Sequence, residues 1–170
     1  MGEQNGITPR ICKRKSSFNH RRFESTVTPL VHNIPQNTSS PVMDPIGNLH
    51  SELGETTIQA MVAGFYRRVK EDDILGPMYP ADDWEGSEKR LADFLIFRFG
   101  GSQRYLAERG HPRLRARHFP FIIDAAARDR WLKLMGEAMD EVPIPESSAE
   151  TIRAFFHQVA HMMQNTGVGH

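Results

Sequence analysis

Three side chains of this 170-residue chain could do chemistry together: His118, Tyr66 and Trp131. His118 lies in the irregular stretch RGHPRLRARHFPF, with Pro112 and Pro120 on either side of it. A neutral imidazole on a short, rigid segment can ligate a metal through one ring nitrogen while the other donates to an acceptor. A haem iron is held in this way. We therefore treat His118 as a candidate haem ligand.

Tyr66 and Trp131 are candidate hydrogen-bond donors to a ligand of that iron. Both lie on the apolar stripes of predicted helices, where a phenol O–H or an indole N–H needs a partner. Dioxygen bound to ferrous haem carries partial negative charge. A hydrogen bond to a charged acceptor stabilises the bound state by roughly 1.5–3 kcal/mol. Each donor is therefore expected to slow ligand release by about one to two orders of magnitude.

Each of these residues also has a simpler interpretation. Taken alone, His118 is more often a hydrogen-bonded core or surface histidine, and helical aromatic residues usually only fill volume. His157 and His161 have the i, i+4 spacing that can hold a metal, yet no acidic third ligand is evident, so we expect them to be solvated. His111 is expected to be structural. Four methionines are expected to fill the core, although methionine can ligate haem iron: Met135, Met139, Met162 and Met163.

Length and composition limit the class of protein. The chain has room for one domain plus an extension, and no apolar run is long enough to span a bilayer. Cys12 is the only cysteine, which suits a reducing, cytoplasmic setting. Residues 1–50 hold six Lys/Arg against three Asp/Glu, and the remainder holds 15 against 18. This balance argues against nucleic acid as a partner, because phosphate binding needs a concentrated basic face.

The chain divides near residue 50. Residues 1–50 are rich in Ser, Asn and Pro without an apolar period, and we predict a disordered basic extension there, with a single domain over 51–170. The extension is most simply a solvated leader. An address signal, a weak electrostatic anchor or an organelle transit peptide are the alternatives.

From residue 55 onward the apolar residues follow the period of amphipathic helices. One stripe runs over 58–69 and is expected to stop near Asp73; a second helix is expected over 84–99, ended by Gly100-Gly101. Asp124 is a plausible N-cap for a third long helix. A capping box of Ser147 and Glu150 is expected to start the last helix, which Gly167 would close. With no convincing strand pattern, the fold class is all-α, with one core and room for a cavity.

Five runs of residues resemble the group II truncated haemoglobins. They occur in the right order at compatible spacing, and the resemblance covers about residues 53–166. The runs are GFYRRV (64–69), MYPADDW (78–84), EKRLADFLIFRFGG (88–101), RGHPRLRARHFPF (109–121) and ARDRWLKLM (127–135).

The resemblance implies a two-over-two helical sandwich around a haem b group, with His118 as the proximal iron ligand. It matches Tyr66 to the distal tyrosine, Trp131 to the tryptophan typical of this group, and Tyr79 to the aromatic residue at the first interhelical corner. A small residue, Ser87, falls where larger globins place a distal histidine. The remaining pocket residues that we assign are Leu91 and Phe94 as walls, Arg90 and Arg117 as partners of the haem propionates, and Gly100-Gly101 as a hinge.

These features favour reversible binding of dioxygen, or of another diatomic such as NO or CO, at a ferrous iron. The alternative is a redox enzyme at the same haem, a nitric-oxide dioxygenase or a peroxidase-like enzyme, which would need an external reductase. We assign no catalytic residue. A homodimer is left open, and a haem-free helical interaction module is the third hypothesis.

Overall fold

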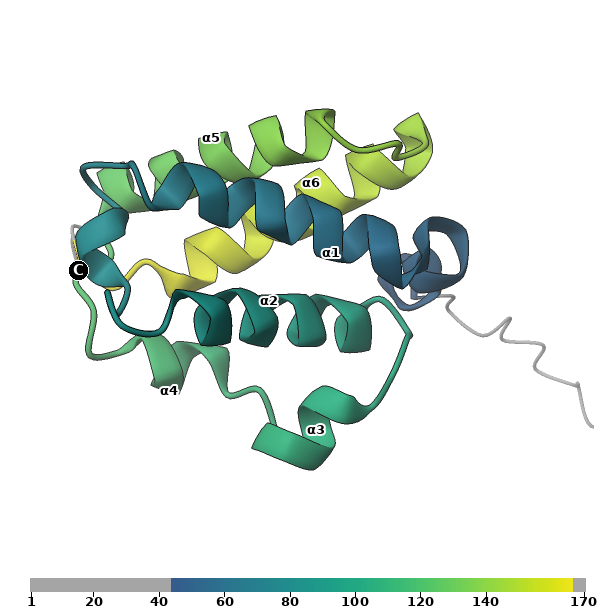
Figure 1. The fold of residues 1–170 in the computed structure, drawn as a ribbon, viewed down its shortest axis with the longest axis horizontal. Coiled ribbons are helices and arrows are strands. Elements are labelled where there is room, and N and C mark those ends of the chain that lie inside the picture. Colours follow the sequence, from purple (N-terminus) through teal and green to yellow (C-terminus); the bar gives the residue numbers. More distant parts are fainter. Residues whose placement is uncertain (1–43, 167–170) are drawn as a thin grey trace, which may run out of the picture. The chain divides into compact units, whose positions relative to one another are not determined.

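The computed structural model describes residues 44–166, and every regular element in that range is helical (Figure 1). The two single-turn 3-10 helices are η1 (Pro45–Asn48) and η2 (Gly76–Met78). The α-helices are α1 (Leu49–Val69), α2 (Trp84–Arg98), α3 (Arg104–Arg109), α4 (Leu114–His118), α5 (Ala125–Asp140) and α6 (Glu146–Met163). Not one of the helices in this range is both long and apolar enough to cross a membrane.

Four long helices form the core in two packed pairs. α1 lies against α2, α5 lies against α6, and α1 also packs on α5. Their apolar stripes meet in one cluster, in which Ile58, Phe65, Met135 and Ile152 are almost completely buried. Burial of this kind contributes about 1.5–3 kcal/mol per large apolar side chain. The arrangement confirms the predicted all-α, two-over-two fold.

The helical structure begins before residue 51. Residues 1–43, which include Cys12, lie outside the described range, but η1 starts at Pro45, within the predicted extension. The Asp44 carboxylate accepts a hydrogen bond from the Ile46 amide (3.1 Å) and caps this element. Ile46 and Leu49 are buried against the core, so the chain here has apolar contacts that the sequence pattern did not reveal.

The first predicted helix ends earlier than expected. α1 ends at Val69, because the Asp72 side chain accepts hydrogen bonds from the amides of Ile74 (3.0 Å) and Leu75 (2.8 Å) and turns the chain. The second helix, α2, agrees with its prediction to within one residue.

The start of α5 confirms its predicted cap, whereas the start of α6 does not. The Asp124 carboxylate accepts from the Ala127 amide (2.8 Å) at the first turn of α5. The predicted capping box of α6 is wrong: Pro145 is the N-cap and makes no side-chain cap, and Ser147 already lies inside the helix. The helix then ends at Met163; Gly167 lies outside the described residues.

The glycine pair after α2 allows a close approach to the start of α1. Gly100 has a φ of 92°, and a Cβ there would lie 1.8 Å from the carbonyl oxygen of Gly47. The amide of His50 donates to the carbonyl of Phe99 (2.8 Å) across the same contact. Any side chain at position 100 would therefore push the two segments apart.

Candidate functional site

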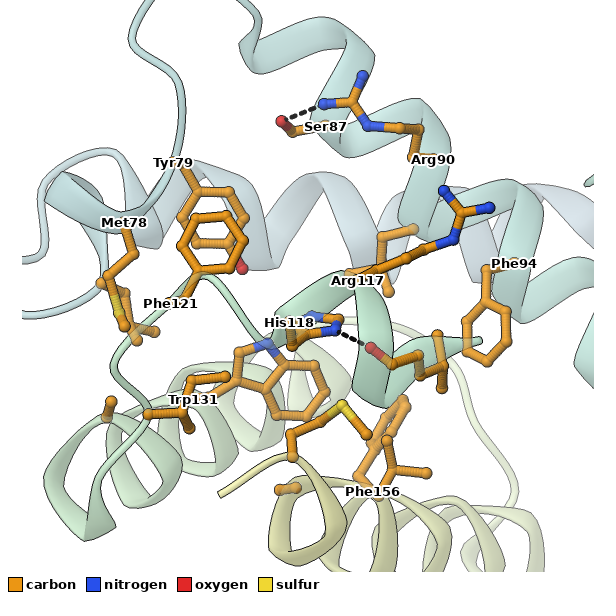
Figure 2. A pocket seen from close by; sticks show the side chains of 18 of the residues that line it. Met78, Tyr79, Ser87, Arg90, Phe94, Arg117, His118, Phe121, Trp131 and Phe156 are labelled. Carbon is orange, nitrogen blue, oxygen red and sulfur yellow. Dashed lines mark hydrogen bonds between the residues drawn. The ribbon is translucent and has the colours of Figure 1, made fainter. Parts of the chain in front are cut away.

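One cavity of about 600 Å³ lies inside the helical sandwich, a volume within the range of small-molecule and cofactor sites. Figure 2 shows side chains from η2, α2, α4, α5 and α6 directed into it, and Tyr66 of α1 completes the wall. The cavity brings together all eight residues that the sequence assigned to a pocket: Tyr66, Tyr79, Arg90, Leu91, Phe94, Arg117, His118 and Trp131.

His118 is the last residue of α4, and its ring is half-buried in the cavity wall. Its Nδ1 donates a hydrogen bond to the backbone carbonyl of Leu114 (2.8 Å), one turn earlier in the helix (Figure 2). The carbonyl can only accept, so this bond places the proton on Nδ1 and leaves the Nε2 lone pair available to a metal. The geometry is that of an oriented imidazole ligand.

The short helix that carries His118 is tied down at both ends. Before it, the Arg117 guanidinium donates to the backbone carbonyls of Pro112 (2.8 Å) and Arg109 (2.9 Å). After it, the side chain of Asn165 accepts from the Ile123 amide (3.0 Å) and donates to the Phe121 carbonyl (2.8 Å). These bonds hold a helix that is too short to be stable alone.

Tyr66 lies opposite, on α1, and is almost completely buried. Its hydroxyl donates to the backbone carbonyl of Ser87 on α2 (3.0 Å). Burial raises the pKa of Tyr66 well above its ordinary value, so the phenol is neutral at physiological pH. The structure thus gives this hydroxyl an internal partner, which the sequence did not predict.

Tyr79 lies at the corner between η2 and α2, packed edge-on against Tyr66 with ring centroids 5.5 Å apart. Its other face stacks on Trp84 at 5.8 Å. Burial raises the pKa of Tyr79 to about 12. Hydrogen bonding with the side chains of Trp131 and Tyr66 lowers this pKa, but the effect of burial is larger. Tyr79 is therefore also a neutral phenol that can donate.

Trp131 of α5 forms the third polar group of this wall. Its ring packs against Phe65 and Phe156, each at a centroid distance of 5.3 Å. These contacts fix the plane of the indole, and the residue borders the cavity (Figure 2). An N–H on a ring held in this way is preorganised to donate to a bound molecule.

The two predicted propionate partners, Arg90 and Arg117, both border the cavity. Arg90 is held by the carboxylate of Asp83 (2.7 Å) and the hydroxyl of Ser87 (2.7 Å). Arg117 is held by the backbone carbonyls described above. Each guanidinium has five N–H donors, so both retain donors for an anionic group.

The site fits a haem group. Its lining is mainly apolar, one imidazole offers an unprotonated nitrogen, arginines lie at the edge, and phenol and indole donors lie on α1, α5 and the interhelical corner. A flat apolar macrocycle with two carboxylates and one open axial position requires these features.

Sequence reasoning missed much of the apolar wall and one further arginine. Several of these residues belong to helical stripes that the sequence already identifies as buried. A buried stripe does not show whether its side chains fill the core or line a cavity, and only the structure reveals the cavity. They include Met78, Tyr105, Arg109, Ile123, Phe155 and Phe156.

The alternative metal sites have no support within residues 44–166. No group of three His, Cys, Asp or Glu side chains lies close enough to hold a metal in that range. His157 and His161 are exposed, as expected. The prediction that Met162 fills the core is wrong: it is 45% exposed, since it falls on the outer side of α6, whereas Met163 is buried.

Comparison with known proteins agrees with this geometry. Residues 48–165 match the family model described as bacterial-like globin. A group 2 truncated haemoglobin of Bacillus subtilis is 36% identical over 116 residues, covering 68% of this chain and 87% of the relative.

Two solved structures have the same fold. A thermostable haemoglobin from the actinobacterium Thermobifida fusca has a TM-score of 0.68 and 38% identity, covering 71% of this chain and 98% of its own. A truncated oxygen-avid haemoglobin from Bacillus subtilis has a TM-score of 0.65 and 34% identity, covering 68% of this chain and 98% of its own. The chain therefore belongs to the bacterial-like globin family and, within it, to the group II truncated haemoglobins.

Proposed function

We propose that this protein holds haem b through Nε2 of His118 and binds dioxygen reversibly at the ferrous iron, with NO and CO as further ligands. Membership of the truncated haemoglobin family implies haem-based oxygen binding. The observation that carries the residue assignment is the Nδ1 bond of His118 to Leu114 at the wall of the apolar cavity. When bound, the haem supplies an iron centre to which a diatomic ligand can attach and from which it can leave.

On the α4 side, His118 acts as the proximal ligand. The Leu114 carbonyl fixes the tautomer and the rotation of the ring, and it makes Nε2 a better electron donor. Arg117 and Asn165 hold the segments on either side of the ring, so its position does not depend on the haem alone.

On the opposite side, Trp131, Tyr79 and Tyr66 stabilise the ligand. Trp131 and Tyr79 offer a neutral N–H and a neutral O–H at the cavity wall, and the indole also interacts with the Tyr79 hydroxyl. To donate to a bound ligand, Tyr66 must give up or share its hydrogen bond to the Ser87 carbonyl. This cost reduces the net stabilisation that Tyr66 gives the ligand. We expect slow dioxygen release, a property that suits scavenging, storage or sensing in the cytoplasm better than bulk oxygen transport.

The decisive experiment is the absorption spectrum of the reduced protein with and without carbon monoxide, repeated with His118→Gly. The wild type is expected to show a haem Soret band that shifts on addition of carbon monoxide. His118→Gly is expected to lose the five-coordinate ferrous signature, and added imidazole is expected to restore it. An unchanged ferrous spectrum in this variant would remove His118 from the proximal position.

A redox enzyme at the same haem, acting on NO or on peroxide, is the second candidate. The observation that favours it is that Arg113 and Arg115, on the segment that carries His118, have no carboxylate oxygen within 4.0 Å in residues 44–166. Such a cationic surface suits an acidic external electron donor. Repeated turnover with such a donor would distinguish this activity from reversible binding, whereas a single turnover would not.

A further inference from the structure

The arginines around α4 differ from every other arginine in residues 44–166. Eight arginines of that range have a carboxylate oxygen within 4.0 Å: Arg67, Arg68, Arg90, Arg98, Arg104, Arg128, Arg130 and Arg153. The four others form no such ion pair within the described chain, and all four lie in one segment: Arg109, Arg113, Arg115 and Arg117. No Asp or Glu occurs between Glu108 and Asp124. Arg109 and Arg117 border the haem cavity, so the positive charge that has no partner in this segment belongs to Arg113 and Arg115.

Exposed apolar side chains gather in the same region. Large hydrophobic residues are exposed at four positions of the described chain, and three of them follow α4: Phe119 (79%), Phe121 (41%) and Ile122 (73%). Of these, Phe121 also borders the haem cavity. The fourth is Met162 (45%) on α6, the helix against which α4 packs. Exposed aromatic, Met and Arg residues together are typical of protein interfaces rather than of ordinary surface.

A surface cleft of about 610 Å³ lies between α4 and α6. Its polar side chains are those of Arg98, His111, Arg113, Arg115 and Gln158, and Met162 borders it. Four apolar residues of this cleft also line the haem cavity: Phe94, Leu114, Phe155 and Val159. One layer of side chains therefore separates the cleft from the site that His118 faces.

We propose that this surface, the α4 face (the cleft residues Arg113, Arg115 and Met162), is the docking site of an acidic one-electron carrier protein. The proposal rests on the proposed function, because the electron is destined for the haem. Carboxylates of the carrier would meet Arg113 and Arg115, and an apolar side chain would enter the cleft. In the electron transfer, the reduced carrier loses one electron, the ferric iron gains one, and no bond is formed or broken.

Three other occupants fit the observations less well. Residues 1–50 carry six Lys/Arg against three Asp/Glu, so they are repelled by the arginines rather than attracted. A second copy that used the same face would place arginine against arginine. An anionic membrane would satisfy the charges, but a flat bilayer would not fill the cleft beside Met162.

The test measures binding separately from turnover. The ferric, haem-loaded protein is titrated with an oxidised flavodoxin, an acidic one-electron carrier, by isothermal calorimetry at low and high salt. The expected result is binding that weakens with ionic strength and a dissociation constant at least about tenfold higher in the Arg113→Glu/Arg115→Glu variant.

The matched control is Arg67→Glu/Arg153→Glu, which changes the net charge equally. These two side chains are 63% and 44% exposed, and both lie outside the cleft. This variant is expected to bind like the wild type, apart from a small effect of net charge. Met162→Ser is expected to weaken binding without changing the salt dependence, because it removes an apolar contact only.

Two kinds of result would overturn the proposal. In the first, the flavodoxin does not bind, or both double variants lose affinity equally. In the second, phosphatidylcholine vesicles containing phosphatidylglycerol bind the wild type through Arg113 and Arg115 while the flavodoxin does not, which would assign the face to a membrane. The carbon monoxide spectrum of each variant reports the state of the haem site independently of carrier binding. A variant that has lost the proposed haem function is therefore distinguished from one that has lost only the docking site.

Discussion

The hydroxyl of Tyr66 on α1 donates to the backbone carbonyl of Ser87 on α2, 3.0 Å away. The phenol that faces the cavity is thus also a link between two core helices. The role that we propose for it in ligand binding is therefore coupled to its role in stability, because one proton cannot be donated fully to two acceptors.

Replacing Tyr66 with Phe should therefore affect both properties. We expect the free energy of unfolding of the apoprotein to fall by about 0.5–1.5 kcal/mol, the usual contribution of one such bond, with the Ser87 carbonyl left without its donor. Chemical denaturation measures this change. The dioxygen dissociation rate, measured by stopped flow, should rise by less than about tenfold. A variant as stable as the wild type would contradict the bond to Ser87.

Trp131→Phe should have the larger effect on the ligand. The ring contacts with Phe65 and Phe156 are largely retained, while the only N–H of the side chain is lost. We expect the dioxygen dissociation rate to rise by about 10- to 100-fold.

Tyr105→Phe serves as the matched control, since it removes a hydroxyl from a cavity residue of α3 that the sequence did not assign to the ligand. Its dissociation rate should stay close to that of the wild type. Equal effects of the two substitutions would show that general disturbance of the pocket, and not the indole N–H, controls release.

Acid stability should depend on Glu141. Hydrogen bonds from Arg68 and Arg67 lower the pKa of its carboxyl from 4.5 to about 2. Because the folded-state pKa is depressed, the stabilisation is fully present above pH 4.5 and is lost as the pH falls toward 2. Glu141→Gln should be less stable than the wild type at neutral pH, and the difference should shrink across this interval. Carboxyl titration by NMR checks the pKa directly; a value near 4.5 would refute the assignment.

Gly100→Ala should destabilise the fold without touching the cavity. The substitution forces a side chain into a left-handed backbone and into the Gly47 carbonyl. We expect a loss of about 1–3 kcal/mol in unfolding free energy, measured by denaturation. Gly110→Ala is the informative control: its φ is also positive, at 67°, but no atom lies within 4 Å of the added Cβ. If both lose the same amount, backbone conformation explains the loss and the contact with Gly47 does not.

The features that sequence predicts well are local ones. α2 and α5 follow from apolar stripes with clear end signals, and the Asp124 cap forms because an acidic residue directly precedes the first helical turn. The pocket residues could be predicted because five separate runs fit one family. For the helices and the cap, the information lies within a few residues of the feature itself.

The sequence predictions fail where contacts between distant segments determine the local structure. The Ser147 capping box fails because Pro145 already starts the helix, and the neighbouring Ser148 bonds to Glu52 of α1 instead. The partner of Tyr66 depends on the distance between α1 and α2, which no local pattern encodes. The cleft beside Met162 likewise arises only when α4 packs against α6.

The clamp that Asn165 makes around residues 121–123 has a practical meaning for protein engineering. The residue lies two positions beyond the end of α6, where a designer would ordinarily trim the chain or attach a tag. A truncation at Met163 would leave every core helix whole and yet release the backbone that follows His118. Such a shortened protein should fold and purify normally while losing its prosthetic group more readily, a fault easily misattributed to poor haem supply in the expression host.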